Sequence, residues 1–346
     1  MNILYTIHRY TVIKTMSPEE RKQKVVPRCV FFGGKAAPGY FMAKRIIKLI
    51  SVVSGVVNAD PDVNPYLLVV FVPNYCVSLA ETLIPATDVS QHISTAGMEA
   101  SGTSNMKVRK ERHSVLIMLI SPQFAMNGAL MLATLDGANV EIRDTIGKAN
   151  VFIFGTRAEQ VEEVRHNMRL EKIPLDPRLA DVLKLLRGST FGDPKDWSSI
   201  IDSISRGNDY YLVNADFPLY YAAQDEVSAA YKDQAGWLRR CIFSIARSGV
   251  FSSDRTILQY AKEIWNIEPA RRPGQTAVSV AELASKGIVP PGLQETLGVS
   301  PATLHMPLVK MESKTTPSAA KYSSVIQHVE MGFDPKTNDS ERVHDV

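Results

Sequence analysis

The sequence is poor in cysteine, in long apolar runs and in excess charge, and each shortage excludes a class of protein. The three cysteines, Cys29, Cys76 and Cys241, are far apart and fit neither a disulfide framework nor a zinc site. The longest unbroken aliphatic run, Val115 to Ile120, is far shorter than the roughly 20 residues that span a bilayer. A net charge of +3 is too small to indicate a nucleic-acid or membrane partner. We therefore expect a cytoplasmic protein with no metal site.

The first half of the 346-residue chain alternates between helical patterns and short apolar runs. Residues 1–16 predict a helix, because apolar side chains recur in them at helical spacing: Ile3, Leu4, Ile7, Tyr10 and Val12. His8 and Arg9 lie where a signal peptide would be apolar, which argues against such a peptide. Ser17 and Glu20 then form a capping-box pattern. A longer helix is predicted over residues 41–57. Its expected inner face consists of Phe41, Ile46, Ile47, Ile50 and Val53.

Short apolar runs predict the strands. They are VVPRCVFFGG, which ends at Gly33 and Gly34, then LLVVFV at residues 67–72, MLATLDG, and VFIFG at residues 151–155, with a helix over SLAETLI. Near-continuous apolar strands that alternate with helices are typical of a doubly wound, parallel α/β sheet.

From Ala158 onward the pattern is helical, with predicted helix ends at Gly188 and Gly249 and a predicted helix start at Ser253 or Asp254. After Arg272 the composition changes. Only two of the 27 aromatic residues lie in residues 273–346, where Ser, Thr, Pro and Lys recur. Such a segment has little to bury, so we expect a disordered tail there.

The segment from Ser94 to Lys107, STAGMEASGTSNMK, is the most unusual stretch. Its small residues allow backbone amides to converge on an anion, and its hydroxyl groups add donors. A lysine beside such a nest supplies what pyridoxal phosphate needs, an amine for a Schiff base and donors for the phosphate. Composition alone favours a plain solvated loop. The glycine loop Gly33 to Gly39 matches neither a Walker A nor a dinucleotide motif.

EASGTSNMK resembles the cofactor motif of the α-glucan (glycogen/starch) phosphorylases, and its neighbours agree in order. They include VVPR, GGKAAPGY, NGAL, DGANVEI and SGVFSSDRTI, so the resemblance covers about residues 1–272. It implies the C-terminal, doubly wound Rossmann-like lobe of a two-domain glycosyltransferase B-type fold, with the N-terminal lobe missing. It also implies a glycosyltransferase that uses pyridoxal 5'-phosphate and inorganic phosphate to release glucose 1-phosphate from glycogen or another α-1,4-glucan. Family members are homodimers.

The resemblance also assigns site residues. Lys107 matches the Schiff-base lysine, which overrides the loop interpretation at that position. Thr103 and Gly102 match positions at the cofactor phosphate and the sugar, and Tyr75 matches an aromatic of the cofactor pocket. The glucose-contacting turn is matched by Glu99, Ala100, Ser101 and Gly102. Two alternatives stay open: Glu99 as an exposed loop acid, and Tyr75 as a core-packing residue.

The chain departs from the family in three places. The basic stretch that holds the phosphates in the family, and the N-terminal lobe, have no counterpart before Met1. Residues 108–123, VRKERHSVLIMLISPQ, are a 16-residue insertion. Every Val codon begins with GT and one Gln codon ends in AG, so a retained in-frame intron is one hypothesis for it. The tail after Arg272 does not resemble the family, and both a gene-model artefact and a regulatory extension stay open.

Two hypotheses about function follow. By family, the chain is a phosphorylase represented by its C-terminal lobe. By the departures, it is a non-catalytic remnant or a partner-binding Rossmann-like domain. The insertion begins directly after Lys107, where a catalytic site tolerates errors of about 0.5 Å, so we expect that lysine to be poorly positioned. A transaminase-like enzyme fits poorly, because it would use the cofactor ring as an electron sink.

Overall fold

A computed structural model describes residues 1–98, 125–205 and 208–268. The chain divides into two units, Met1–Pro269 and Ala270–Val346, and all described residues lie in the first. Its strands are β1 (Arg28–Gly33), β2 (Leu67–Val72), β3 (Val89–His92), β4 (Leu130–Thr134) and β5 (Val151–Phe154). Its helices are α1 (Asn2–Thr15), α2 (Pro18–Lys24), α3 (Phe41–Ala59), α4 (Val77–Leu83), α6 (Ala138–Ile146), α7 (Val161–Arg169), α8 (Pro177–Arg187), α9 (Ser198–Ile204), α10 (Val213–Lys232), α11 (Gln234–Arg247) and α12 (Ser253–Tyr260).

The described strands are all parallel, which confirms the predicted mixed α/β class with parallel sheets. They form two sheets, however, and not one continuous sheet: β1 pairs with β2, and β3, β4 and β5 pair in that order. The strand β3 was not predicted, since its sequence VSQH lacks a run of apolar residues.

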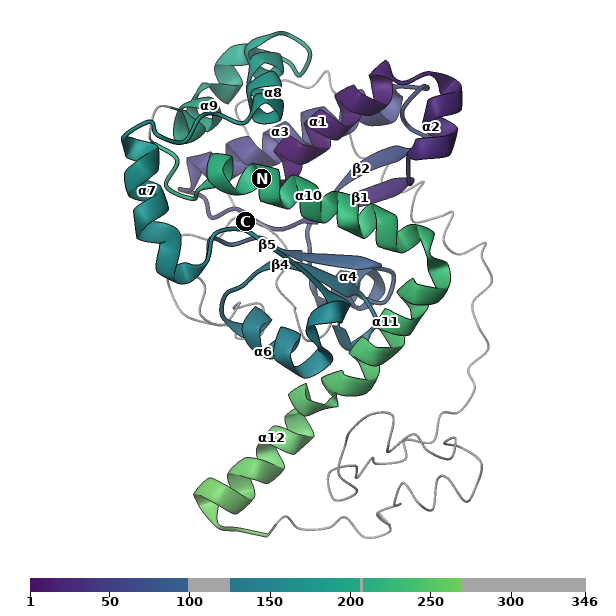
Figure 1. Cartoon of the computed structure of the whole chain (residues 1–346), viewed down its shortest axis with the longest axis vertical. Helices are drawn as coiled ribbons and strands as arrows, with labels where there is room; N and C mark the ends of the chain where they lie inside the picture. Colours follow the sequence, from purple (N-terminus) through teal and green to yellow (C-terminus); the bar gives the residue numbers. More distant parts are fainter. Residues whose placement is uncertain (99–124, 206–207, 269–346) are drawn as a thin grey trace, which may run out of the picture. The chain divides into compact units, whose positions relative to one another are not determined.

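One hydrophobic core covers one face of both sheets. It contains Phe32 of β1 and Leu67 of β2, and equally Leu132 of β4 and Phe152 of β5. The helices α1, α3, α8, α9 and α10 contribute the facing side chains, and α10 runs across the middle of the unit (Figure 1). On the opposite face a smaller core joins α6 to β4 and β5. The two sheets therefore share one helical layer.

The helix predicted over residues 41–57 is present as α3, but its inner face was predicted in part wrongly. Phe41 is 72% exposed, because the residues that face the core are Ala43, Leu49, Ile50, Val53 and Val57. The predicted strand at residues 67–72 is parallel as expected, yet Leu68 is 41% exposed, so it is not buried on both faces.

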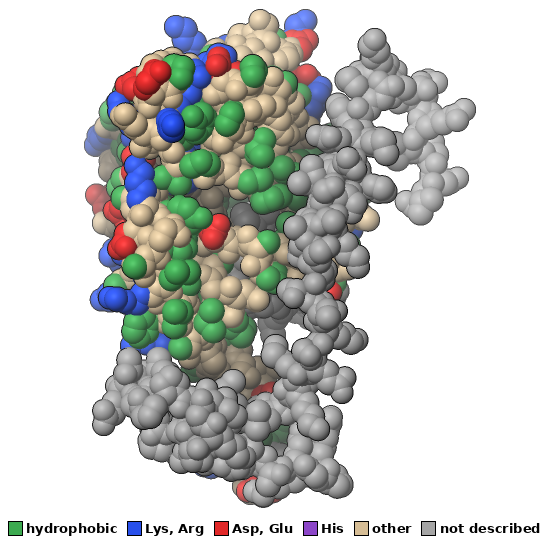
Figure 2. All heavy atoms as spheres, turned by 90° about the vertical axis from the view of Figure 1, so that its right-hand side faces the viewer, with side chains coloured by type: hydrophobic (Ala, Val, Ile, Leu, Met, Phe, Trp, Pro, Cys, Tyr) green, Lys and Arg blue, Asp and Glu red, His purple; other side chains and the backbone are tan. Residues whose placement is uncertain are grey.

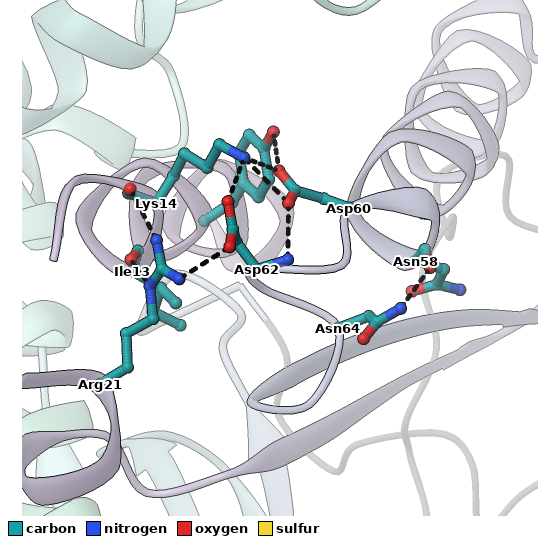
Figure 3. A network of polar contacts seen from close by, with 8 residues as sticks. Ile13, Lys14, Arg21, Asn58, Asp60, Asp62 and Asn64 are labelled. Carbon is teal, nitrogen blue, oxygen red and sulfur yellow. Dashed lines mark hydrogen bonds and ion pairs between the residues drawn. The ribbon is translucent and has the colours of Figure 1, made fainter. Parts of the chain in front are cut away.

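Polar contacts tie α1 and α2 to the turn after α3 (Figure 3). The predicted capping box is confirmed, with the Glu20 amide donating to Ser17 Oγ and the Ser17 amide donating to the Glu20 carboxylate. The Asp60 carboxylate, in the turn after α3, accepts hydrogen bonds from Tyr10 (2.9 Å) and Lys14 (3.0 Å). Asp62 forms ion pairs with Lys14 and Arg21. This network fixes α1 across the end of α3.

Of the three helix termini predicted after Ala158, one is confirmed and two differ. Helix α8 ends at Gly188 as expected. Helix α11 is capped by Ser248, and Gly249 lies inside the following 3-10 turn. Helix α12 has Ser252 as its N-cap residue, with no side-chain cap, so neither Ser253 nor Asp254 caps it.

Hydrophobic side chains remain exposed on the described surface. Figure 2 shows several of them grouped between charged side chains on one face of the molecule. On α11 and around α12 the exposed fractions reach 64% at Ile242 and 66% at Ile264. No helix among the described residues is long and apolar enough to cross a membrane.

Candidate functional site

The candidate site lies at the carboxyl ends of the parallel strands, the edge at which doubly wound sheets bind ligands. At the first sheet, Gly33 ends β1 and Tyr75 follows β2. The Tyr75 ring lies against Gly33 so closely that a Cβ atom on Gly33 would be 2.9 Å from Tyr75 Cδ2. The absence of a side chain at Gly33 is therefore what admits the ring.

The surroundings of Tyr75 support both interpretations of this residue. Its ring packs on a small cluster formed by Ala80, Ile84 and Ala129, as the core-packing alternative requires. Burial raises the pKa of its phenol, so the hydroxyl is neutral at pH 7. One side of the residue remains accessible, so a role in a cofactor pocket stays a prediction.

Cys76 occupies the N-cap position of α4 and is exposed. A hydrogen bond from the backbone amide of Leu79 is the largest cause that lowers the pKa of its thiol, and Ser78 and Lys35 add to the effect. Its Sγ atom lies 3.7 Å from Ser78 Oγ.

The first residues of the small-residue motif are held at two points. Thr134, at the end of β4, donates from its hydroxyl to the Ser94 carbonyl at 2.7 Å. Thr95 donates from its hydroxyl to the Tyr211 carbonyl at 2.8 Å. Gly97 has a φ of +81°, a conformation that favours glycine. The beginning of the motif is thus anchored to β4 and to the segment before α10.

The predicted residues of the motif itself lie outside the described part of the chain. These are Glu99, Ala100, Ser101, Gly102, Thr103 and Lys107, and the insertion at residues 108–123 lies there too. Their roles at the cofactor and the sugar therefore stay predictions. Of the predicted site residues, the structure describes Tyr75.

The ends of β4 and β5 form a fixed frame beside the motif. Asn139 donates from its amide to the Thr134 carbonyl at 3.1 Å. Asp216 of α10 accepts hydrogen bonds from the Thr156 amide (2.7 Å) and hydroxyl (2.6 Å), just after β5. Burial raises the pKa of Asp216, and the Thr156 bonds partly offset that effect. None of these residues was predicted, since no local pattern marks contacts between distant segments.

His92 was not predicted to be catalytic. It lies at the end of β3, is buried, and approaches Ser90 Oγ with its Nε2 at 3.3 Å. Burial lowers the pKa of its imidazole to about 4. The ring is therefore neutral at pH 7 and is suited to a packing role.

Parallel strands under one helical layer, with glycines and hydroxyl groups at their carboxyl ends, define a Rossmann-like α/β unit. The chain belongs to the carbohydrate phosphorylase family, whose model matches residues 1–267. It is 49% identical over 291 residues to glycogen phosphorylase 2 of Dictyostelium discoideum. The aligned residues make up 84% of this chain and 27% of that relative. It is 52% identical over 279 residues to the cytosolic alpha-glucan phosphorylase 2 of Arabidopsis thaliana. The aligned residues make up 79% of this chain and 31% of that relative. The chain thus spans less than a third of the length of these relatives.

Proposed function

We propose that this chain is the cofactor-binding lobe of an α-1,4-glucan phosphorylase, with residues 1–272 as the lobe and residues 273–346 as a disordered tail. In this proposal the lobe is half of a two-domain glycosyltransferase B-type fold that acts as a cytoplasmic homodimer. The whole enzyme would release glucose 1-phosphate from glycogen or a related glucan with inorganic phosphate. The observation that carries the proposal is the family match over residues 1–267, which includes the EASGTSNMK motif.

We assign pyridoxal 5'-phosphate to Lys107, with Thr103, Gly102 and Tyr75 around it. When bound, this cofactor supplies a phosphate that exchanges a proton with the substrate phosphate. Glu99, Ala100, Ser101 and Gly102 would hold the glucose unit. The described part fits such a group: Gly33 admits the Tyr75 ring at the strand ends, and Thr134 and Thr95 fix the start of the motif.

We further propose that the chain by itself does not catalyse phosphorolysis. Electrostatic stabilisation is usually the largest catalytic contribution, and the basic residues that hold the two phosphates in the family have no counterpart in this sequence. The insertion after Lys107 also interrupts the segment that must position its amine. A non-catalytic, partner-binding role is the second candidate, and the same insertion favours it.

Borohydride reduction of the full chain with pyridoxal phosphate, followed by peptide mapping, tests the cofactor assignment. We expect a pyridoxyl group on Lys107. In a Lys107→Arg variant treated in the same way, only the background labelling of surface lysines should remain. Labelling spread equally over exposed lysines would contradict the assignment and favour the non-catalytic candidate. A glucose 1-phosphate assay with glycogen and inorganic phosphate tests the second claim. Measurable release by the chain alone would refute it.

A further inference from the structure

Helix α11 carries apolar side chains on the face that it turns to solvent. Leu238, Ile242 and Ile245 have exposed fractions of 57%, 64% and 47%. Their spacing of four and three residues places them in one line along the helix, about 10 Å long, which we call the α11 stripe. Within α11, which lies wholly in the described part of the chain, Arg239 is the one exposed charged residue. A surface helix normally has a polar outer face, so this face is suited to a contact.

The opposite face of α11 is already packed, so the helix cannot turn the stripe inward. The Trp237 ring is buried and stacks on Phe152 of β5, with 6.3 Å between the ring centroids. The Arg240 guanidinium lies over the same Phe152 ring at 5.5 Å. At the other end of the helix, Arg247 donates to the Ile146 carbonyl of α6 at 3.5 Å. The orientation of α11 is therefore fixed at both ends, and the helix lies at the outside of the unit (Figure 1).

The chain enters β4 beside this stripe. A Cβ atom on Gly128, just before β4, would be 3.2 Å from Ile245 Cδ1 and 3.8 Å from Cys241 Cβ. Ala125 is 3% exposed, so the residues that lead to Gly128 are held in the unit. The residues directly before Ala125, 99–124, lie outside the described part of the chain. That segment therefore ends next to α11.

The topology also brings this segment across the sheet. The strands β3 and β4 are parallel neighbours, with Val89 paired to Leu130. A connection between two such strands must return from the carboxyl end of the first to the amino end of the second, over one face of the sheet. Its start is anchored at the carboxyl end by the hydrogen bond from Thr134 to Ser94, and its end lies at Gly128. The last residues of the connection therefore lie on the same side as α11.

The insertion in this connection contains an apolar run that can reach the stripe. Val115 to Ile120, VLIMLI, is the longest aliphatic run in the sequence. An extended chain spans at most about 3.6 Å per residue, so the five residues from Ile120 to Ala125 reach at most about 18 Å. This reach exceeds the length of the stripe. The run can therefore contact Leu238 as well as Ile245.

Charge and composition distinguish this run from other occupants. The run is uncharged, and the basic residues of the insertion, Arg109, Lys110 and Arg112, lie toward its other end. A second copy that docked through the same stripe would add its own Arg239, and α11 contains no acidic residue to offset the two charges. Residues 273–346 are rich in Ser, Thr, Pro and Lys and offer little apolar surface. The insertion is the occupant that these observations favour.

We propose that the apolar run Val115–Ile120 of the insertion docks on the α11 stripe of the same chain. Docking covers apolar side chains on both partners, which would otherwise form exposed patches. It also fastens the lengthened β3–β4 connection to the unit at α11. The stripe is then occupied by the chain itself and is not available to another protein. This inference does not depend on cofactor binding or on catalysis.

Photo-crosslinking of the full chain tests the occupant. Leu238, at the end of the stripe farthest from Gly128, is replaced by p-benzoylphenylalanine, and the products are mapped to single residues by tandem mass spectrometry. We expect an intramolecular cross-link to residues 115–120. The same probe at Leu170, 51% exposed at the end of α7, is the control and should not link to that run. A cross-link between two chains, a link to residues 270–346, or none to residues 115–120 would each overturn the proposal.

The rate of thiol alkylation tests whether the stripe is covered. In a Leu238→Cys variant, Arg239 and Arg240 place the new thiol in a different tryptic peptide from Cys241, so its reaction can be followed separately. Alkylation should be at least tenfold slower than in a chain that also carries Leu116→Ser, Ile117→Ser and Leu119→Ser. A Leu170→Cys thiol is the control and should react equally fast with both insertions. Equal rates at position 238 would overturn the proposal. If circular dichroism shows that the serine variant does not fold, the cross-link decides.

Discussion

Substituting Gly33 by Ala should destabilise the protein through one side chain. A Cβ atom at this position would lie 2.9 Å from Tyr75 Cδ2 and 3.5 Å from Tyr75 Cγ. Gly33 has no positive φ, so its backbone accepts alanine and the cost comes from the contact alone. The half-buried ring must move by a few tenths of an ångström against the cluster of Ala80, Ile84 and Ala129. Overpacking of this kind costs about 1–3 kcal/mol.

The matched control is Gly55→Ala. Gly55 is exposed within α3, and a Cβ atom there would meet nothing within 4 Å. Alanine in a helix interior is favoured over glycine by about 0.5–1 kcal/mol, so this variant should be more stable than the unmodified protein. Urea unfolding measures both changes as shifts of the midpoint at constant slope.

A double mutant isolates the contact. In a Tyr75→Leu background the ring is absent, so Gly33→Ala should lose most of its cost. An equal loss of stability in both backgrounds would show that Tyr75 is not the cause. A Gly33→Ala variant as stable as the unmodified protein would refute the close approach itself. If Tyr75 belongs to the cofactor pocket, Gly33→Ala should also lower the labelling of Lys107.

Other predictions concern two buried carboxylates. Asp60→Ala should cost about 2 kcal/mol, because it removes the hydrogen bond to the half-buried Tyr10. Asp62→Ala should cost less, because its ion pairs with Lys14 and Arg21 lie at an exposed site where solvent screens them. Urea unfolding at pH 7 compares the two variants, and equal losses of stability would contradict the burial argument. Burial raises the pKa of Asp60, but hydrogen bonds from Lys14 and Tyr10 outweigh it and lower the pKa below 3.8, so the Asp60→Ala deficit should shrink as pH falls below that value. Asp216→Ala should cost about 2 kcal/mol, since it leaves the part-buried amide and hydroxyl of Thr156 without their acceptor, while Asp216→Asn keeps an acceptor. Burial raises the pKa of Asp216 above its ordinary value, so the protein should lose part of its stability as pH rises from that ordinary value through the raised pKa, while the hydrogen bonds from Thr156 remain. The Asn variant should lack this pH dependence, and identical pH profiles would contradict the argument.

Local signals predicted most elements of the fold. The capping box at Ser17 and Glu20 and the apolar runs of β1, β2, β4 and β5 each specify a structure within a few residues. Phe41 was placed on the wrong face because the position of α3 is set by which residues reach β2. The strand β3 was missed because Ser90 and His92 are buried by neighbouring segments and not by their own hydrophobicity.

The site was predicted only where it is local. The motif from Ser94 to Lys107 can be recognised in the sequence, as can Gly33 and Gly34 at the end of β1. The anchors of its first residues cannot, because Thr134 lies 40 residues from Ser94, and Tyr211 lies 116 residues from Thr95. Each anchor is a hydroxyl that donates to a backbone carbonyl, and such a contact leaves no periodic pattern in the sequence.

The interruption between β1 and β3 has the same origin. Periodicity identifies each strand but contains no information on which strands are neighbours, and a doubly wound pattern predicts one sheet by default. The contacts that link the two sheets join Arg28 and Gln91 through Gln224, across 196 and 133 residues. Buried arginine and glutamine side chains are costly unless their hydrogen bonds are satisfied. Their bridge therefore joins β1 and β3 under α10, although these two strands do not pair with each other among the described residues.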